Sequence, residues 1–420
     1  MVQIKDAYIK GTRNNETFQR NSLGVFPKEW KLKKLSDVGK ISSGVTPLRS
    51  NEEFFGGKIP WVKTTDLNNS FILDTEEKIT ELALKETSLK MVQSNSILVA
   101  MYGGFNQIGR TGLMKINGTT NQALSSFYVD EKEFHSEYIL HWLNSFRGYW
   151  KRLAGSSRKD PNITKKDVES FPIMQPVYKE QKKIASVLST WDKAIELKGN
   201  LIKQKKEQKK GLIQRLLTGK VRLPGWEGKV KQVKLKGFIK EVKERNKENK
   251  VKRILSVTNS RGFINQSDQF GRQIASEDLT SYKVVKNGQF AYNPSRVNVG
   301  SIDLLNQFDE GLLSPMYVIF ETRQDKLLPE YIYHFLKSNL FLNQMGNLLQ
   351  GSVRQSLSYD GLEEIKLFIP NDLNEQREIS QILTLLDKEI NLLQRELEEL
   401  NNQKIGLMQL LLTGKVRVKV

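Results

Sequence analysis

The sequence predicts an α+β protein in which two globular halves, built mostly of β-strands, alternate with two long helices that pair as an antiparallel coiled coil. Three observations predict this fold. The 420-residue chain contains an internal repeat, each copy ends in a long stretch with heptad spacing, and short β-like runs precede each of those stretches. The repeat also predicts a pseudo-twofold relation between the halves.

The repeat runs through most of the chain. The heptapeptide LLTGKVR stands at 216–222 and again at 411–417, and a gap-free alignment of 180–222 with 375–417 has close to half of its positions identical. Three shorter matches extend the repeat toward the N-terminus of each copy. They pair YILHWLNS (138–145) with YIYHFLKS (331–338), GSSR (155–158) with GSVR (351–354), and FPIMQPVYKEQ (171–181) with LFIPNDLNEQ (367–376).

This repeat divides the chain into five parts. The helical segments are more alike than the globular ones, which is the contrast expected of a shared scaffold that carries two sites of different specificity. The expected parts are an N-terminal tail over 1–23, a first globular domain over 24–178, a first helix segment over 179–222, a second globular domain over 223–374 and a second helix segment over 375–420.

Each helix segment has apolar residues at alternating steps of three and four. The spacing predicts a helix of about 38 residues, roughly 55–60 Å long at 1.5 Å per residue. Gly219 and Gly414 stand where a helix C-cap is expected. The apolar seam comprises Ile184, Leu188, Trp191, Ile195, Ile202, Leu212 and Leu216 in the first copy, and Ile379, Leu383, Leu386, Ile390, Leu393, Leu397, Leu400, Leu407 and Leu411 in the second. Lysines fill other seam positions: Lys198, Lys205, Lys209 and Lys404.

The charges of the two helix segments favour pairing between them. A lone helix of this length needs a partner, and opposite flanking charges select partners in coiled coils. Antiparallel pairing about a common midpoint would bring a basic middle beside an acidic one. The alternative is that each helix pairs with another chain. The basic residues are Lys198, Lys203, Lys205, Lys206, Lys209 and Lys210, and the acidic ones are Glu389, Glu396, Glu398 and Glu399.

Short apolar runs bounded by turn-forming residues predict mostly antiparallel strands in each globular half. An amphipathic helix is expected to follow the strands, over 138–150 in the first half and 329–346 in the second. The strand-like runs are KIPWVKT, NSILVAMY, TGLMKI and SSFYVD in the first half, and KRILSVTN, GQFAYNP, GSIDLL and MYVIFET in the second.

Composition favours a partner of negative charge. The formal net charge is +19, which attracts nucleic acid, acidic membranes or acidic proteins, and of these we favour nucleic acid. The absence of cysteine excludes disulfides and thiolate metal sites and fits a reducing cytosol. No run of about 18 apolar residues predicts a membrane span, and the N-terminus lacks a signal-peptide core. We therefore expect a cytoplasmic protein that does not contact a membrane.

The residue inventory argues against catalysis. There are three histidines, of which His141 and His334 occupy equivalent positions of the repeat, and this equivalence favours packing over metal ligation. The sequence contains no HExxH motif and no P-loop, since the TGK at 413–415 ends a helix where a P-loop begins one. The glycine-rich GGFNQIG (103–109) lacks GxGxxG spacing. NPSR (293–296) lacks the second proline and the aromatic residue of the adenine methyltransferase loop. We expect no catalytic residue, metal or cofactor.

The layout resembles that of the specificity (S) subunit of Type I restriction–modification systems, and the resemblance covers nearly the whole chain. Its markers are EQKKIASVLSTWDKAI, EQREISQILTLLDKEI, both LLTGKVR copies and SYKVVKNGQFAYNPSRVNVGSI (281–302). The resemblance implies that each globular half is a target recognition domain for one half of a bipartite, asymmetric double-stranded DNA sequence. The helices would set the half-site spacing.

The same resemblance implies partners. Two modification subunits, which methylate adenine from S-adenosylmethionine, would dock on the chain, and two restriction subunits would add ATP-driven translocation and cleavage. The S subunit itself is non-catalytic, in agreement with the inventory. A rod of roughly 55–60 Å exceeds the roughly 34 Å of one B-DNA turn, so it could hold two readers on successive grooves.

Candidate DNA contacts are loop residues of the types that read bases or bind phosphates, found at corresponding places in both halves. Arg158 and Arg354 recur between the copies, and recurrence favours a phosphate over a specific base. The candidates are Arg158 and Lys159 with Arg354 and Gln355; Asn106, Gln107 and Arg110 with Arg296 and Asn298; and, more weakly, Lys63, Thr64, Asn259 and Arg261.

Three other interpretations stay open at this point. An RNA-binding protein would need clustered exposed aromatic residues, which the sequence does not clearly offer. A coiled-coil scaffold without a nucleic-acid role agrees poorly with the net charge of +19. A methyltransferase–specificity fusion needs a cofactor motif and a further domain, for which the chain has no room. The salt dependence of DNA binding would separate the first two interpretations from a specificity subunit. Binding of a cofactor by the isolated chain would support the third.

Overall fold

A computed structural model describes residues 17–154, 162–270, 278–349 and 356–420. The chain forms two compact units, one of residues 1–198 and 396–420 and the other of residues 199–395. Their boundary differs from the expected domain limits, because it cuts both long helices in the middle. Each unit therefore contains one globular half and one half of each helix.

The first unit is built on a five-stranded sheet with the order β4-β11-β8-β9-β6. Alternate residues of its central strands face two different cores, as the period of two requires. Ile97 and Val99 face helix α4 (Ser136–Ser145), whereas Leu98 and Ala100 join a second cluster. The strands are β4 (Ser42–Ser43), β11 (Leu124–Tyr128), β8 (Ser96–Ala100), β9 (Thr111–Met114) and β6 (Ser70–Ile72).

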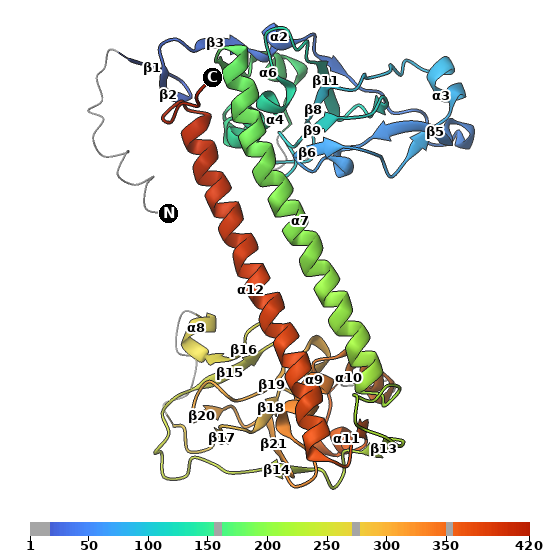
Figure 1. Cartoon of the computed structure of the whole chain (residues 1–420), viewed down its shortest axis with the longest axis vertical. Helices are drawn as coiled ribbons and strands as arrows, with labels where there is room; N and C mark the ends of the chain where they lie inside the picture. Colours follow the sequence, from blue (N-terminus) through green and yellow to red (C-terminus); the bar gives the residue numbers. More distant parts are fainter. Residues whose placement is uncertain (1–16, 155–161, 271–277, 350–355) are drawn as a thin grey trace. The chain divides into compact units, whose positions relative to one another are not determined.

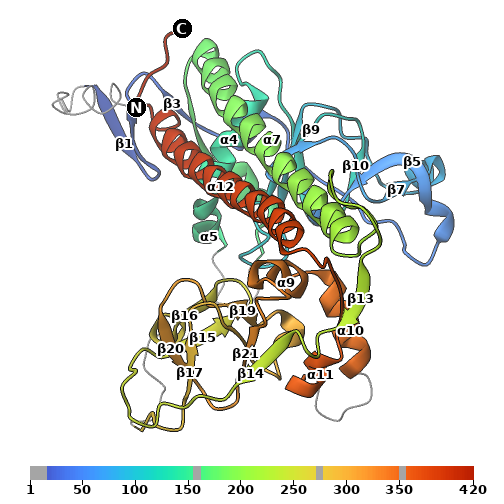
Figure 2. The same ribbon diagram turned by 60° about the horizontal axis from the view of Figure 1, so that its bottom comes forward.

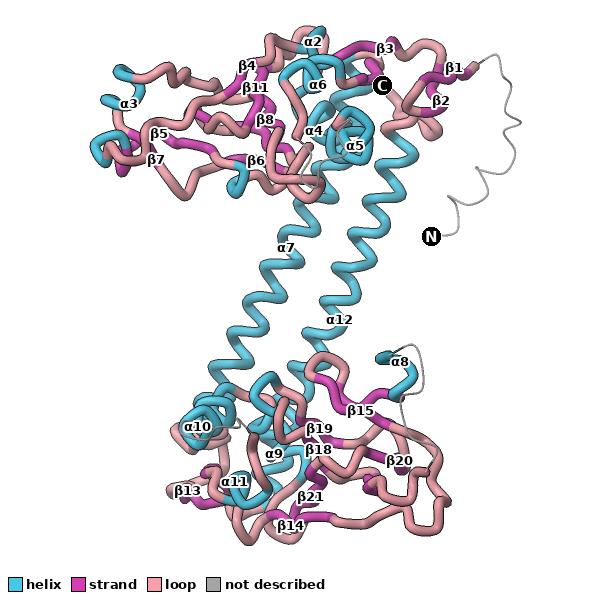
Figure 3. The backbone as a smooth tube through the Cα atoms, turned by 180° about the vertical axis from the view of Figure 1, so that it is seen from behind, coloured by secondary structure: helices cyan, strands magenta, loops and turns pink. Residues whose placement is uncertain are grey.

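A smaller sheet of the first unit projects away from α4 together with α3 (Figures 1 and 3). Its order is β10-β5-β7, and Trp61 and Ile79 form its core with Ala83 of α3. The strands are β10 (Thr119–Thr120), β5 (Phe55–Val62) and β7 (Lys78–Ile79), and α3 is Glu81–Glu86. The remaining elements are β1 (Phe18–Asn21), β2 (Gly24–Pro27), β3 (Lys31–Lys34), α2 (Leu35–Val38), η1 (Glu52–Phe54), η2 (Thr64–Asp66), η3 (Arg147–Tyr149), α5 (Trp150–Leu153), α6 (Lys165–Ser170) and β12 (Pro172–Gln175).

The second unit repeats this plan on a four-stranded sheet, β14-β21-β18-β19. Phe290 and Phe320 face α9, whereas Ala291 and Ile319 face the cluster of β15 and β16. Helices α10 and α11 lie on the opposite side from the strands β15, β17 and β20 (Figures 1 and 2). The elements are β13 (Lys231–Lys234), β14 (Ile239–Val242), β15 (Leu255–Thr258), β16 (Gly262–Asn265), α8 (Gln266–Phe270), β17 (Lys283–Lys286), β18 (Phe290–Tyr292), η4 (Val297–Val299), β19 (Ile302–Leu304), β20 (Glu310–Leu313), β21 (Val318–Thr322), α9 (Pro329–Leu336), α10 (Asn339–Leu349), α11 (Tyr359–Glu363) and β22 (Lys366–Ile369).

Two sequence expectations need correction. Part of the expected tail, Phe18–Asn21, is a strand paired with β2. The two amphipathic helices are each broken, at Phe146 and at Lys337, whose backbones leave the helical region (ψ 20° and 5°). The break lets the second segment turn inward: Trp150 packs against Phe171 with ring centroids 4.1 Å apart and the planes tilted by 31°, and Phe341 packs against Phe335.

Both long helices are present, as α7 (Tyr178–Leu216) and α12 (Leu373–Leu411) of 39 residues each. Their ends belong to the globular cores. Ile184 and Leu188 pack in the first unit with Met408 and Leu411, and Leu216 packs in the second unit with Ile379 and Leu383. The start of one helix and the end of the other thus share a core in each unit. Within the described residues, no helix combines the length and hydrophobicity that a membrane span requires.

The repeated LLTGKVR motif ends in an arginine that clamps the other helix. In the second unit Arg222 binds the Glu375 carboxylate at both oxygens (Nε–Oε1 2.6 Å, Nη2–Oε2 2.5 Å). In the first unit Arg417 binds Glu180 in the same way (2.6 and 2.8 Å). Both carboxylates are buried, with side chains 1% and 2% exposed. The last residue of each motif therefore fixes the first turn of the opposite helix.

Every lysine at a seam position is neutralised by a carboxylate of the facing helix. In the first unit Lys404 pairs with Asp192, and Lys198 lies 2.7 Å from Glu396. In the second unit the pairs are Lys205–Glu389 (2.7 Å) and Lys209–Asp387 (2.5 Å). Within each unit, higher numbers on one helix face lower numbers on the other, so the helix segments run antiparallel.

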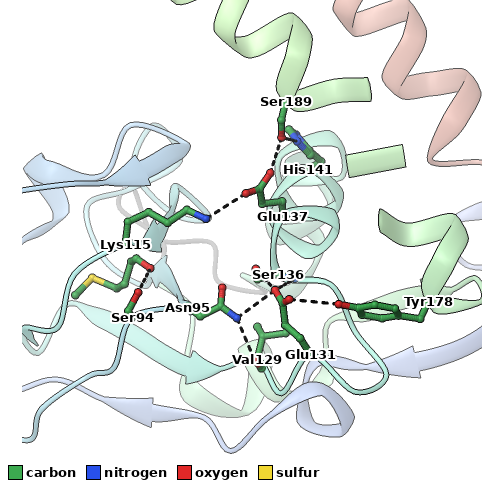
Figure 4. A network of polar contacts seen from close by, with 11 residues as sticks. Ser94, Asn95, Lys115, Val129, Glu131, Ser136, Glu137, His141, Tyr178 and Ser189 are labelled. Carbon is green, nitrogen blue, oxygen red and sulfur yellow. Dashed lines mark hydrogen bonds and ion pairs between the residues drawn. The ribbon is translucent and has the colours of Figure 1, made fainter. Parts of the chain in front are cut away.

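The equivalent histidines lie where each globular half meets the helices. Figure 4 shows His141, whose Nε2 is 3.2 Å from Ser189 Oγ, while the Ser189 hydroxyl donates to Glu137 (2.7 Å). The imidazole therefore carries its proton on Nε2. Burial lowers the pKa of His141 to about 3 and that of His334 to about 4, so both are neutral at pH 7. Their packing role agrees with their equivalence in the repeat.

The buried clamp gives a stability prediction. Replacing Glu375 with Gln leaves the Arg222 guanidinium half-buried without a counter-charge, which should lower the free energy of unfolding by about 3 kcal/mol. Calorimetry or urea unfolding measures the loss. Glu364→Gln is the matched control in the same unit, since its pair with Lys234 has the same 2.5 Å length but is exposed. It should cause no measurable change. Equal effects from the two variants would contradict the role of burial.

His334 gives a prediction of pH dependence. It is the single histidine between residues 199 and 395, and its folded pKa of about 4 lies below the ordinary value of 6.5. A depressed folded pKa means that the stability is fully present above pH 6.5 and is lost as the pH falls toward 4. The loss should be about 1.4 kcal/mol per pH unit. His334→Gln should flatten this slope between about pH 6.5 and 5.5 in calorimetry, where few carboxylates titrate. An unchanged slope would refute the assignment.

Candidate nucleic-acid interface

Four of the sequence-predicted contacts lie outside the described residues. These are Arg158, Lys159, Arg354 and Gln355. The other nine are described, and they fall on three kinds of loop. One loop joins two neighbouring strands of each large sheet (β8 to β9 and β18 to β19), a second joins β15 to β16, and a third follows β5.

The loop between β8 and β9 (101–110) is held rigidly. Gly109 N donates to Ala100 O (2.9 Å), and the backbone amides of Gln107 and Ile108 both donate to Gly104 O (3.0 Å each). Gly109 is in the left-handed region (φ 70°), and a Cβ there would lie 2.0 Å from the Trp150 ring, so no other residue fits. These hydrogen bonds fix the second half of the loop, and the side chains of Phe105 and Asn106 are exposed before it.

Arg147, two residues after the end of α4, hydrogen-bonds to the backbone of this loop. Its Nη2 donates to Asn106 O (2.7 Å), while Arg110 Nη1 donates to Gln107 Oε1 (2.9 Å). Asn106 is exposed, and Gln107 and Arg110 are half-buried. Gln107 is thus engaged with its neighbour, which leaves Asn106 as the amide that points to solvent.

A cluster of cations without acidic partners surrounds the loop. Burial lowers the pKa of the Arg147 guanidinium, and the nearby positive charge of Arg110 lowers it further. Within the described residues, none of the three cations beside the loop forms an ion pair with a carboxylate. Phe105, Asn106, Arg147 and Lys151 line a cleft of about 340 Å³ that contains no acidic residue. The cluster comprises Arg110, Arg147 and Lys151. Unneutralised like charges around a cleft are suited to a phosphate backbone.

The second unit has the corresponding loop between β18 and β19 (293–301). Arg296 and Asn298 are both exposed in it, and Gly300 (φ 88°) ends the η4 turn. Ser301 Oγ donates to Val257 O (2.6 Å), which ties the loop to β15. Asn259, in the β15–β16 turn, lies against Gly300, where an added Cβ would be 2.6 Å from its Oδ1. The structure therefore brings Asn259 next to the Arg296–Asn298 loop.

Asn259 and Arg261 also line a cleft of about 560 Å³ in this unit. Arg261 and Lys388 of α12 are both exposed and both line the cleft. The lining also contains three acidic residues: Asp303 and Asp387 are paired with Lys337 and Lys209, and Glu330 is exposed. Arg261 and Lys388 are therefore cations of a cleft that also contains an exposed carboxylate.

Lys63 and Thr64 are placed less favourably. The Lys63 ammonium lies 2.6 Å from Glu77, and its side chain is 17% exposed. Its hydrogen bond to Glu77 raises the pKa of Lys63, so the charge is held but already neutralised. Thr64 begins the η2 turn and is half-buried. Both remain untested as DNA contacts.

Sequence reasoning missed several residues that the structure adds to this surface. The sequence placed Arg147 in an amphipathic helix over 138–150 and assigned no role to Lys151. The break at Phe146 begins a new segment, and both side chains line the cleft beside the loop. Phe105 was not among the predicted contacts. Its position, as an apolar residue inside a glycine-rich, polar segment, could have indicated an exposed contact residue. Among the described residues, no group of three or more His, Asp or Glu side chains is arranged to hold a metal ion.

The family model of the Type I restriction modification DNA specificity domain matches residues 27–207 and again residues 233–402. The chain belongs to this family. The two matches coincide with the two globular halves and the greater part of each long helix. The β8–β9 loop lies in the first matched segment and the β18–β19 loop lies in the second.

Known members agree in length and fold. The Type I restriction enzyme MjaIX specificity subunit of Methanocaldococcus jannaschii is 33% identical over 186 residues, which is 43% of this chain and 42% of that subunit. The MjaVIII specificity subunit of the same organism is 25% identical over 419 residues and 94% of both chains. The crystal structure of a Type-I restriction-modification system S subunit from M. genitalium has a TM-score of 0.59 at 16% identity, over 91% of this chain and 96% of that one. At that identity the likeness shows the fold.

The cation cluster predicts a change in the salt dependence of DNA binding. For the specificity chain assembled with its modification subunits, Lys151→Gln should reduce the slope of log K against log salt by about 0.9, the value of one phosphate contact on B-DNA. Fluorescence anisotropy at several salt concentrations measures the slope. Lys132→Gln is the matched control, because Lys132 is an exposed lysine already paired with Asp130 (3.4 Å). If both variants keep the wild-type slope, Lys151 does not contact a phosphate.

Proposed function

We propose that this chain is the DNA-reading subunit of a Type I restriction–modification complex, in which each globular half reads one half of a bipartite, asymmetric double-stranded target. The observation that carries the proposal is the double match of the specificity-domain family, once per half. Each half also has its own loop between two neighbouring strands of its large sheet, and the two loops differ in sequence. Two different loops on equivalent frames suit a target whose two halves differ.

The long helices are proposed to fix the spacing of the half-sites. Each has 39 residues, about 58 Å at 1.5 Å per residue, which exceeds the roughly 34 Å of one DNA turn. The charge-paired seam and the two arginine clamps support an antiparallel coiled coil whose register cannot slip. The equivalence of the clamps, Arg222–Glu375 and Arg417–Glu180, supports a pseudo-twofold relation between the halves.

Two copies of one modification subunit are proposed to dock on equivalent surfaces of this frame. Leu197 and Leu392 are separated by the same 195 positions as the two LLTGKVR copies, and their exposed fractions are 56% and 58%. Exposed leucines at equivalent positions on the helices suit an identical apolar contact made twice. In a restriction-competent complex two restriction subunits join this assembly. The chain itself contributes no catalytic residue, metal or cofactor and acts by positioning the enzyme subunits on DNA.

Methylation mapping tests the function directly. DNA from cells that carry the chain with its modification subunits should contain methyl-adenine at one motif of two different half-sites with a fixed gap, and deletion of the chain should abolish it. Asn106→Ala should relax the sequence of one half-site only, and Arg296→Ala that of the other half-site only. If both variants change the same half, or if deletion leaves methylation intact, the assignment of one half-site to each domain fails.

A further inference from the structure

Each reading loop exposes an apolar side chain directly beside an asparagine. In the first unit Phe105 precedes Asn106, and in the second Val299 follows Asn298. The exposed fractions are 45% for Phe105 and 56% for Val299. The same pairing of an amide with an apolar group therefore occurs in the same loop of both halves, although the two loops share little sequence.

The fold does not account for these exposed groups. The 101–110 loop is closed by its own backbone hydrogen bonds and by Gly109 against Trp150, and the Lys151 ammonium lies 5.6 Å from the centroid of the Phe105 ring. In the second loop, Val297 is the residue that enters the core, whereas Val299 points outward. The recurrence of an exposed apolar group beside an asparagine in both loops suits a ligand that has an apolar group, since covering that side chain would gain free energy.

The chemistry of the pair indicates which group that is. In the major groove, thymine C5-methyl is the apolar group by which base pairs differ, and asparagine pairs in a bidentate manner with adenine N6 and N7. Adenine and thymine present these groups on the same edge of one base pair. An amide next to an apolar side chain is thus the complement of an A·T pair.

We propose that Phe105 and Val299 are specificity-determining residues that contact a thymine methyl group in their respective half-sites, with Asn106 and Asn298 facing adenine. The inference rests on the proposed function and deepens it, since it names the base pair that each loop reads. The cations beside the loop, Lys151 and Arg147, take the neighbouring phosphates and fix the depth to which Phe105 reaches. Valine is shorter than phenylalanine, so the second loop approaches its groove more closely.

The test removes the methyl group from the DNA. The chain is assembled with its modification subunits, and its affinity is measured by anisotropy on the mapped motif and on duplexes with deoxyuridine in place of one thymine at a time. One substitution in the first domain's half-site should weaken binding roughly fourfold, the equivalent of about 0.8 kcal/mol for one buried methyl group. Phe105→Ala should bind the thymine and uracil duplexes equally, and Phe105→Leu should retain part of the difference.

Matched variants separate this contact from general loss of binding. Val299→Ala should remove the uracil effect in the other half-site only. Leu73→Ala removes an even more exposed apolar residue (69%) outside the loops and should keep both effects. The inference is overturned if wild type is indifferent to every uracil substitution, if Phe105→Ala loses affinity equally on both duplexes, or if the mapped half-site lacks an A·T pair. Those outcomes are compatible with a bipartite methylated motif that disappears when the chain is deleted, whereas failure of the proposed function means that methylation persists after the deletion.

Discussion

Two buried carboxylates hold this structure together. Glu180 and Glu375 lie at the first turn of the two long helices, and each is bound at both oxygens by the arginine that follows the end of the other helix. Burying a carboxylate to 1–2% exposure costs free energy unless the charge is fully paired. The first turn of one helix is therefore stable only when the arginine after the end of the other helix is in place. Because Trp30 also donates to Glu180 (3.2 Å), the clamp reaches into the first globular half.

The sequence predicted the parts of the fold that repeat a simple pattern. Heptad spacing located helices of 39 residues to within a few positions, and alternating apolar runs located β8, β9, β18 and β21. It failed where tertiary contacts override local pattern. The helical period continues through Phe146 and Lys337, but burial of Trp150 and Phe341 bends the chain there. Likewise, the seam lysines were visible in the sequence, whereas their partners Asp192 and Asp387 could be assigned only once the register was known.

The sequence predicted that the candidate site would consist of polar loop residues, but it identified only some of those residues. Asn106, Arg296 and Asn298 were found because polar residues cluster in loops between strong strand signals, and the structure leaves all three exposed. Lys63 has the right charge, yet Glu77, 14 positions away, neutralises it. Phe105 and Lys151 escaped notice because exposure and ion-pair state depend on residues distant in sequence.

The ion-paired lysines of the seam also make the association of each helix selective for its partner helix. A cell contains many other long amphipathic helices, and a purely apolar seam would bind several of them. Lys209 and Lys404 fit only a partner that offers a carboxylate at the matching position, as Asp387 and Asp192 do within their units. A foreign helix would bury an unpaired ammonium, at a cost that outweighs the leucine contacts it gains. The same ion pairs that align the helices thus disfavour association of a newly synthesised chain with long amphipathic helices of other proteins.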